Sequence, residues 1–150
     1  MPVDFTNYPP LRPGRNPSAR AVTALQCLLS ERGHYRGKLH GRYDDATITA
    51  VRAWKTRRGL PTTARFTRAH WVAFHAEGWA LAAKLGSTGA HVRRAQRALN
   101  AADPELKRRV DGVFSATTAA DVRAYQKRTG LRQTGIVNKP TWAKLRAGVR

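Results

Sequence analysis

The sequence predicts an all-α protein built from two tandem, small three-helix repeats that follow an extended, proline-rich N-terminal arm. Three observations support this prediction. A sequence motif occurs twice, apolar residues recur at the spacing of an α-helix, and capping residues stand at the ends of the predicted helices. We place the arm at residues 1–17, the first repeat at residues 18–79 and the second repeat at residues 80–150.

The repeat is clearest where residues 41–60 align with residues 112–131. Gly41 and Thr47 of the first copy are matched by Gly112 and Thr118 of the second, and further identical pairs are 51/122, 52/123, 53/124, 57/128, 59/130 and 60/131. Aromatic character is kept at 43/114 and 54/125, and a Trp stands at both 71 and 142. Ordered matches of this kind indicate a tandem duplication of one supersecondary unit.

The first helix of each repeat is predicted from a single apolar face. Within residues 18–31, Val22, Leu25 and Leu29 recur at helical spacing, and the corresponding helix of the second repeat begins near Ala90. A loop follows each of these helices, at residues 34–42 and at residues 101–113.

The second helix of each repeat is bounded by capping signals. Asp44 and Ser115 are suitable N-cap residues, because a side-chain oxygen accepts a hydrogen bond from a free N–H of the first turn. Gly59 and Gly130 are expected at the C′ positions of the same helices, in the left-handed conformation that glycine adopts at little cost.

A short third helix closes each repeat. It carries Trp71 and Phe74 in the first repeat and Trp142 and Leu145 in the second. Pro140 suits the first turn of the last helix, where a backbone N–H has no partner inside the helix.

The charge of the chain indicates an anionic partner. The 150 residues include 28 Lys and Arg but only 9 Asp and Glu, which gives a formal net charge of +19. The excess is spread over both repeats, so nucleic acid, an acidic membrane surface and an anionic polymer are all candidate partners. No apolar stretch is long enough to span a membrane, and residues 1–17 hold no apolar core of a signal peptide.

The sequence contains no recognisable catalytic constellation. The five histidines form no H-E-x-x-H motif. The adjacent Asp44 and Asp45 are placed to cap a helix and not to act as an acid/base pair across a cleft. The single Cys27 is expected to pack among the leucines of the first helix, and it excludes an intramolecular disulfide and a cysteine-based zinc cluster. We therefore expect a binding module that is not an enzyme and uses no cofactor or metal ion.

The ordered motif reads Val-x-x-(Leu/Ala)-Gln, Gly-x-aromatic-x-x-x-Thr, Val-x-x-aromatic-(Lys/Gln), Gly-Leu and a late Trp. It resembles the short helical peptidoglycan-binding domain attached to many bacterial and phage wall hydrolases, and the resemblance covers both repeats. The second repeat matches more closely. In the first, His40 replaces the usual Asp, Asp44 stands where a small residue is usual, Lys55 replaces Gln and Ala64 replaces Gly.

The resemblance implies that a wall polymer binds in a shallow groove near the loop and the second helix. Aromatic faces, hydroxyl groups and guanidinium groups suit the sugar rings, amides and carboxylates of such a polymer. The candidate ligand-binding residues are Tyr43, Thr47 and Arg52 in the first repeat, and Phe114, Ser115, Thr118, Arg123 and Gln126 in the second.

We therefore predict non-catalytic binding of bacterial cell-wall peptidoglycan, or of an associated anionic wall polymer, in the extracellular cell wall. The chain would be the targeting or anchoring module of a wall hydrolase, a stand-alone wall-binding protein, or part of a phage or larger particle that reaches the wall without a signal peptide. Two alternatives stay open: a basic nucleic-acid-binding protein, and a protein-interaction scaffold whose ligand groove has decayed. Against nucleic acid, the basic residues are not confined to one helix and no helix-turn-helix signature occurs.

Overall fold

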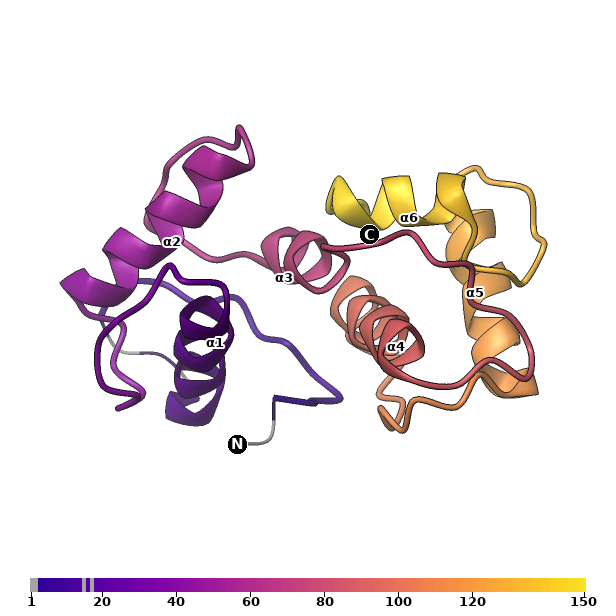
Figure 1. The fold of residues 1–150 in the computed structure, drawn as a ribbon, viewed down its shortest axis with the longest axis horizontal. Coiled ribbons are helices and arrows are strands. Elements are labelled where there is room, and N and C mark those ends of the chain that lie inside the picture. Colours follow the sequence, from indigo (N-terminus) through magenta and orange to yellow (C-terminus); the bar gives the residue numbers. More distant parts are fainter. Residues whose placement is uncertain (1–2, 15, 17) are drawn as a thin grey trace. The chain divides into compact units, whose positions relative to one another are not determined.

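The computed structural model describes residues 3–14, 16 and 18–150, and within them it contains six helices and no strand beyond isolated bridges (Figure 1). The helices are α1 (Ala19–Glu31), α2 (Asp45–Arg57), α3 (Arg68–His75), α4 (Ala90–Ala102), α5 (Ala116–Arg128) and α6 (Lys139–Arg146). Each repeat supplies three of them, so the all-α prediction is confirmed. No helix in this part of the chain is long and apolar enough to cross a membrane.

The helices begin at the predicted capping residues. Asp44 accepts a hydrogen bond from the third residue of α2, and Ser115 accepts the equivalent bond in α5. The same geometry occurs at Ser18 before α1 and at Asn138 before α6, where Pro140 lies in the first turn. Each cap satisfies one backbone N–H that the helix itself leaves without a partner.

The second helices end at glycines, as predicted. Gly59 has φ of +66°, and the N–H of Leu60 donates to the carbonyl of Lys55 at 2.9 Å. Gly130 has φ of +74°, and the N–H of Leu131 makes the corresponding bond at 2.7 Å. These are Schellman motifs, which require a left-handed residue that glycine occupies without steric strain.

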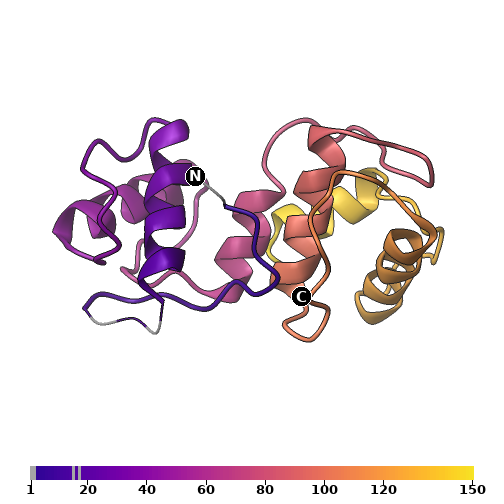
Figure 2. The ribbon, with the colours of Figure 1, turned by 90° about the horizontal axis from the view of Figure 1, so that it is seen from below.

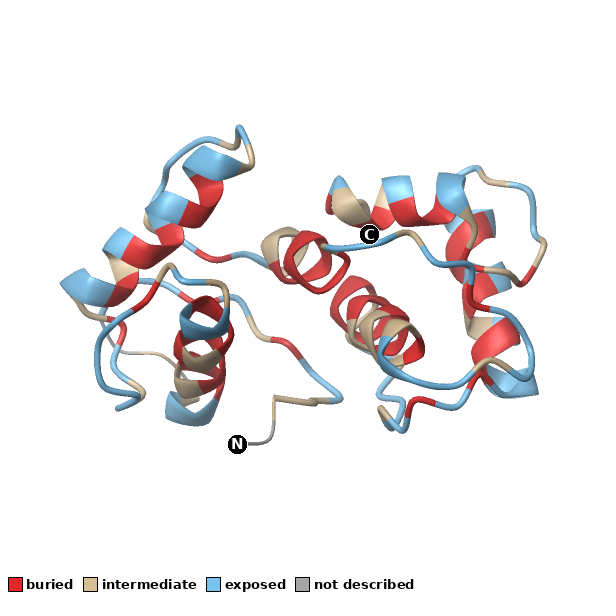
Figure 3. Cartoon of the chain, in the orientation of Figure 1, coloured by how far each residue is buried: buried red, intermediate tan, exposed pale blue. Residues whose placement is uncertain are grey.

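One compact unit, unit 1, contains Pro9–Thr67 together with the start of the chain. Its helices α1 and α2 pack against each other. Leu25 and Leu29 of α1, Val51 and Trp54 of α2, and Phe66 form a core that is almost wholly buried (Figure 3).

The other compact unit, unit 2, contains Asp4–Tyr8 and Arg68–Arg150. Helix α3, the last helix of the first repeat, belongs to this unit because it packs against α4 and α6 (Figures 1 and 2). The compact units therefore divide between Thr67 and Arg68, whereas the sequence repeat predicts a boundary after residue 79. The physical reason is the apolar surface of α3, whose Trp71 and Phe74 are fully buried.

The segment predicted as an extended arm is shared between the two units. Asp4–Tyr8 belongs to unit 2, where Tyr8 is fully buried and its ring packs against His75 of α3. In unit 1, Leu11 exchanges two backbone hydrogen bonds with Phe66, both of 2.8 Å. Residues 1, 2, 15 and 17 of the predicted arm lie outside the described residues.

The backbone pairing of the N-terminal segment in unit 1 has a counterpart in unit 2. The duplication therefore extends upstream of the first helix of each repeat. Ala83 exchanges backbone hydrogen bonds with Val137, as Leu11 does with Phe66. The residues that follow each bridge therefore correspond, which aligns Arg12 with Lys84. The segment around Leu11 therefore belongs to the first repeat and is not a separate arm.

Candidate ligand-binding site

Most of the predicted ligand-binding residues are buried and bonded to the protein itself. Tyr43, Thr47, Phe114 and Gln126 are each at most 3% exposed, and Thr118 is 7% exposed. Arg52, Ser115 and Arg123 are the candidates that reach the surface. The motif thus separates into side chains that shape the site and side chains that a ligand can contact.

In unit 1, Tyr43 and Thr47 fix the start of α2. The Tyr43 hydroxyl donates to the carbonyl of Ala64 at 2.6 Å, and burial raises the pKa of the Tyr43 phenol. The Thr47 hydroxyl accepts from the Gln26 amide and donates to the Asp44 carboxylate, both at 2.9 Å. Both side chains are buried, and the hydroxyl of each is bonded within the protein.

The residues that hold the loop before the second helix were not among the predicted site residues. The Gln96 carbonyl oxygen accepts from the N–H of Gly112 at 2.9 Å, and its amide donates to Asp111 and to the carbonyl of Val113. Gln26 likewise accepts from the N–H of Gly41 and donates to the carbonyl of Arg42 in unit 1, but its other donor bond goes to the Thr47 hydroxyl. A Gln recurs in the first helix of both repeats, and this recurrence could have identified the two residues from the sequence.

His40, which stands where the second repeat has Asp111, accepts the same backbone hydrogen bond as that aspartate. Asp111 accepts from the N–H of Val113 at 2.9 Å, and the His40 Nδ1 accepts from the N–H of Arg42 at 3.1 Å. The loop turn is therefore closed by an acceptor in both repeats. Only in the first repeat does the capping Asp44 also meet this side chain, at 3.0 Å from the His40 Nε2.

Gln126 secures the loop between α5 and α6. Its carbonyl oxygen accepts from the N–H of Gly135 at 3.0 Å. Its amide donates to the hydroxyls of Thr134 and Thr141 and to the carbonyl of Ile136, at 2.9 to 3.1 Å. This buried amide therefore ties the loop at Thr134, Gly135 and Ile136 to the first turn of α6 at Thr141, which fixes the shape of the adjoining surface.

Lys55 takes the place of Gln126 in unit 1 and holds the corresponding loop differently. It is fully buried, and its ammonium group donates to the carbonyl and hydroxyl of Thr63, each at 2.8 Å, and to the carbonyl of Arg65. Burial lowers the pKa of Lys55 to about 8, with a smaller contribution from the positive charge of Arg52. A lysine has no acceptor, so it cannot hold a loop N–H as Gln126 does.

In unit 2, a hollow of about 400 Å³ lies beside α5, and we call it the α5 groove. It is lined by Lys84, Leu85, Ala116, Ala119, Arg123, Thr134, Gly135 and Ile136. The Arg123 guanidinium lies over Gly135, where a Cβ would approach its Cζ to 2.9 Å. The groove combines two cations and a hydroxyl with an apolar lining, and it suits a ligand that carries amides, methyl groups and a carboxylate.

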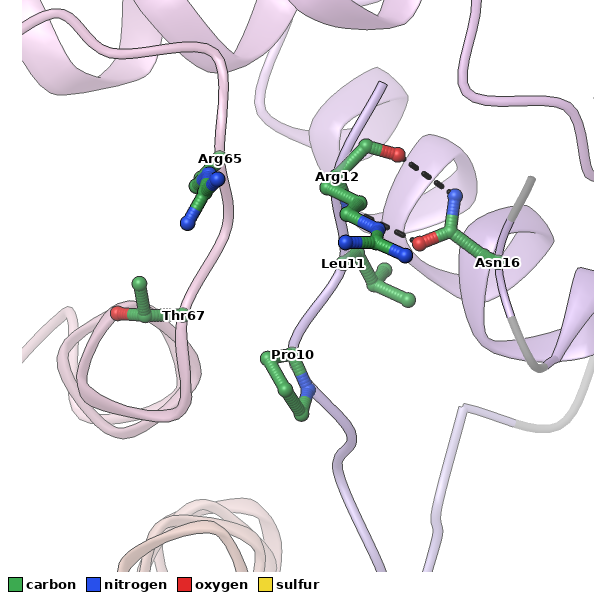
Figure 4. A pocket seen from close by; sticks show the side chains of 6 residues that line it. All are labelled: Pro10, Leu11, Arg12, Asn16, Arg65 and Thr67. Atoms are coloured by element: carbon green, nitrogen blue, oxygen red, sulfur yellow. Dashed lines mark hydrogen bonds between the residues drawn. The ribbon is translucent and has the colours of Figure 1, made fainter. Parts of the chain in front are cut away.

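In unit 1, a hollow of about 360 Å³ lies at the bridge between the N-terminal segment and the end of the repeat (Figure 4). It is lined by Pro10, Leu11, Arg12, Asn16, Arg65 and Thr67. Asn16 accepts from the N–H of Arg12 at 2.9 Å and donates to the Arg12 carbonyl at 2.7 Å, which fixes the backbone there. Arg52 instead donates to the carbonyl of Thr62 at 3.2 Å and does not line this hollow.

Comparison with known protein families gives two matches to one model, which is described as a peptidoglycan binding domain. The matches cover residues 18–73 and residues 88–145, which is more than half of the chain. The chain belongs to the peptidoglycan-binding domain family. No curated protein and no solved structure matches it.

The two peptidoglycan-binding domains account for the repeat that the sequence showed. Each match begins close to the first helix of its repeat and ends within the third. The first match therefore includes most of α3, although this helix packs within unit 2. The segment between the matches, residues 74–87, is not assigned by the family model.

The peptidoglycan-binding domain is a binding module and not a catalytic one. Among the described residues, no group of three or more His, Cys, Asp and Glu side chains is placed to hold a metal ion. The chemistry available in the α5 groove is that of hydrogen bonding, charge and apolar contact.

Proposed function

We propose that this chain binds the peptidoglycan of bacterial cell walls without cleaving it, and that the α5 groove is its main ligand contact. The observation that carries the proposal is the tandem match to the peptidoglycan-binding domain family. The groove supports it, since it lies beside the loop and the helix that carry the family motif.

Within the α5 groove, Arg123 and Lys84 are the residues proposed to contact a carboxylate of the wall peptide. A guanidinium group offers paired N–H donors that match a carboxylate, and an ammonium group adds a second positive charge. The side chains of Leu85 and Ile136 would receive the methyl groups of the peptide. The proposed role of Phe114, Ser115, Thr118 and Gln126 is to hold the loop and helix around this ligand.

In unit 1, the hollow between Arg12 and Arg65 is proposed to take a more anionic group of the wall polymer. The two arginines stand on the same side of the antiparallel bridge between Leu11 and Phe66, Arg12 directly after Leu11 and Arg65 directly before Phe66. Like charges on neighbouring strands repel each other unless an anion lies between them. Two linked contacts on one repeating polymer also raise the effective concentration of each, so modest individual affinities add to a firm attachment.

The test is co-sedimentation with purified peptidoglycan sacculi freed of teichoic acid, at about 0.15 M and about 0.5 M salt. The higher salt shortens the Debye length to roughly 4 Å and removes association that depends on net charge alone. We expect pelleting at both salt concentrations, and a loss of about tenfold in affinity for Arg123→Ala. Lys127→Ala is the matched control, because this exposed cation also lies on α5 but does not line the groove.

Three results would contradict the proposal. Loss of pelleting at the higher salt would mean that the charge and not the groove attaches the protein to the wall. Equal losses for Arg123→Ala and Lys127→Ala would give the same conclusion. Retention on duplex DNA that is tighter than retention on sacculi, in the same buffers, would favour the nucleic-acid alternative.

The proposed place of action is the cell wall, with the chain as the targeting or anchoring part of a wall hydrolase, as a stand-alone protein or as part of a phage-like particle. Immunodetection in wall fractions, followed by the size of the native complex on gel filtration, distinguishes these roles. A chain confined to the cytoplasmic fraction, with no wall-bound pool, would contradict all three.

A further inference from the structure

Trp79 is the only one of the four tryptophans that is exposed. Its side chain is 91% exposed, whereas Trp54, Trp71 and Trp142 are each at most 1% exposed. It lies in unit 2 between α3 and α4, in the segment that neither family match covers. Tryptophan is enriched at binding interfaces, because its ring combines a large apolar face with a polar N–H group.

The backbone that carries Trp79 is held in place by two arginines. Arg94 of α4 donates to the carbonyl of Trp79 at 2.9 Å and to the carbonyl of Ala76 at 3.0 Å. Arg146 of α6 donates to the carbonyl of Gly78 at 2.6 Å. The carbonyls on either side of the turn are thus tied to two different helices. The ring is presented on a fixed backbone, which reduces the entropy lost when a ligand binds.

A hollow of about 400 Å³ adjoins the ring, and we call it the Trp79 hollow. It is lined by Gly78, Trp79, Ala80 and Arg146. Small residues on both sides leave the ring accessible, and Gly78 has φ of +113°, which favours glycine at this turn. The hollow therefore offers one aromatic face bordered by a guanidinium group.

We propose that Trp79 is a stacking platform for a sugar ring of the glycan strand, with Arg146 beside it to bond a hydroxyl or acetamido oxygen. This inference rests on the proposed binding of peptidoglycan. The apolar C–H face of a sugar ring covers an aromatic face, and its polar edge meets a neighbouring donor. A protein partner would instead bury a wider surface, of about 800 Å² on each side for a typical stable complex.

The Trp79 hollow and the α5 groove share no lining residue but lie on the same connecting segment. Trp79 lines one and Lys84 lines the other, so five residues of extended chain separate their Cα atoms by at most about 18 Å. The segment is fixed between them, because the Trp142 indole N–H donates to the carbonyl of Leu81 at 3.0 Å. One wall fragment, its sugar at Trp79 and its peptide in the groove, is the ligand that this arrangement suits.

The first repeat lacks the two arginines that hold this segment. In the alignment of the repeats, Ala24 stands at the position of Arg94 and His75 at the position of Arg146. The two residues that hold the Trp79 segment are therefore specific to the second repeat. This places the proposed sugar contact in unit 2, together with the α5 groove.

The experiment measures binding of tetra-N-acetylchitotetraose, a neutral oligosaccharide without a peptide, through the intrinsic fluorescence of the protein. Because the other tryptophans are buried, a change of emission at long wavelength reports on Trp79. We expect a saturable change in the wild-type protein and none in Trp79→Ala. We also expect Trp79→Ala to weaken pelleting with sacculi about fivefold and Trp79→Phe to weaken it less. Leu81→Ala is the control, since this residue is 59% exposed on the same segment.

The outcomes separate this inference from the proposed function. If the wild-type protein pellets with sacculi but Trp79→Ala pellets equally well, or if the oligosaccharide leaves the emission unchanged, the platform is refuted and the groove stands. If the wild-type protein does not pellet at the higher salt, the proposed function itself fails. Equal losses for Trp79→Ala and Leu81→Ala would refute a sugar platform in favour of a general apolar contact.

Discussion

Lys55 provides a direct test of how the interior of unit 1 is built. Its ammonium group is fully buried and donates to the oxygens of Thr63 and Arg65. Burial lowers its pKa from the ordinary 10.5 to about 8. Replacing Lys55 by Gln introduces the residue that unit 2 uses at the equivalent position, with an amide donor and no charge. The substitution should therefore change the pH dependence of stability without dismantling the loop.

The sign of the effect follows from proton binding. Below about pH 8 the lysine is protonated in both the folded and the unfolded chain, so its contribution to the free energy of unfolding does not depend on pH. Between about pH 8 and the unfolded pKa of 10.5, the folded chain has released the proton and the unfolded chain retains it. The free energy of unfolding must therefore rise with pH in this window, by no more than about 1.4 kcal/mol per pH unit.

The expected rise is on the order of 1 kcal/mol between about pH 8 and about pH 9.5, because the folded lysine is only about half deprotonated at the start of this window. The assay is urea unfolding followed by circular dichroism, with the wild-type protein and Lys55→Gln compared at each pH. Tyr43, whose pKa burial raises, is present in both proteins and cancels in the difference. A difference that stays constant from about pH 7 to about pH 9.5 would refute the reasoning, as would a wild-type protein that loses stability relative to the variant.

Two further predictions concern unit 2. Gly135→Ala should lower the free energy of unfolding by about 1–2 kcal/mol, because φ is +73° and the new Cβ would meet the Arg123 guanidinium; it should also weaken binding to sacculi. Ala64→Gly at the matched position is the control for calorimetry and co-sedimentation, and wild-type behaviour of Gly135→Ala would show that the close approach is absent. Tyr8→Ala should lower the free energy of unfolding by about 3 kcal/mol, since the buried ring leaves a cavity beside α3. The exposed Thr6→Ala is its control in urea unfolding, and equal midpoints for the two variants would mean that Tyr8 does not pack there.

Helix positions were predictable because the signals for them are local. Asp44 and Ser115 cap α2 and α5, and Gly59 and Gly130 end them, each through bonds to residues within one turn. The packing of α3 left no such signal. The apolar residues of α3, which include Trp71, have the same helical spacing whether the helix packs against its own repeat or against the next one. Only the tertiary structure shows which core α3 joins.

The N-terminal pairing was also missed, and here a signal existed. Arg12 precedes Gly14 by two residues, and Lys84 precedes Gly86 by the same spacing. Each pair stands shortly before the first helix of its repeat. The composition of the arm, with its many prolines, suggested an independent extended segment and hid this short match, because isolated bridges require no alternation of polar and apolar residues.

Of the residues predicted to bind a ligand, Arg123 lines the α5 groove, and the other residues that line it were not selected from the sequence. Thr118 and Gln126 are easily recognised in the repeat because folding of the loop requires them, and for the same reason they are buried. Residues that face a ligand make no hydrogen bond that the fold depends on, so they are freer to differ between the two repeats. Lys84 and Ile136 illustrate this, because they line the α5 groove although the repeat gave no reason to select either.

The difference between the two copies begins in the interior. Gln126 both donates to and accepts from its loop, which keeps Gly135 in place under the Arg123 guanidinium. Lys55 only donates, and the loop that it holds carries Ala64 where unit 2 has Gly135. The hollow in unit 1 is lined by Arg12 and Arg65, which stand where unit 2 has Lys84 and Ile136 in the α5 groove. One buried substitution therefore accompanies a change from a mixed apolar and cationic groove to a more basic hollow, and on this difference we propose that the two units prefer different groups of the wall polymer.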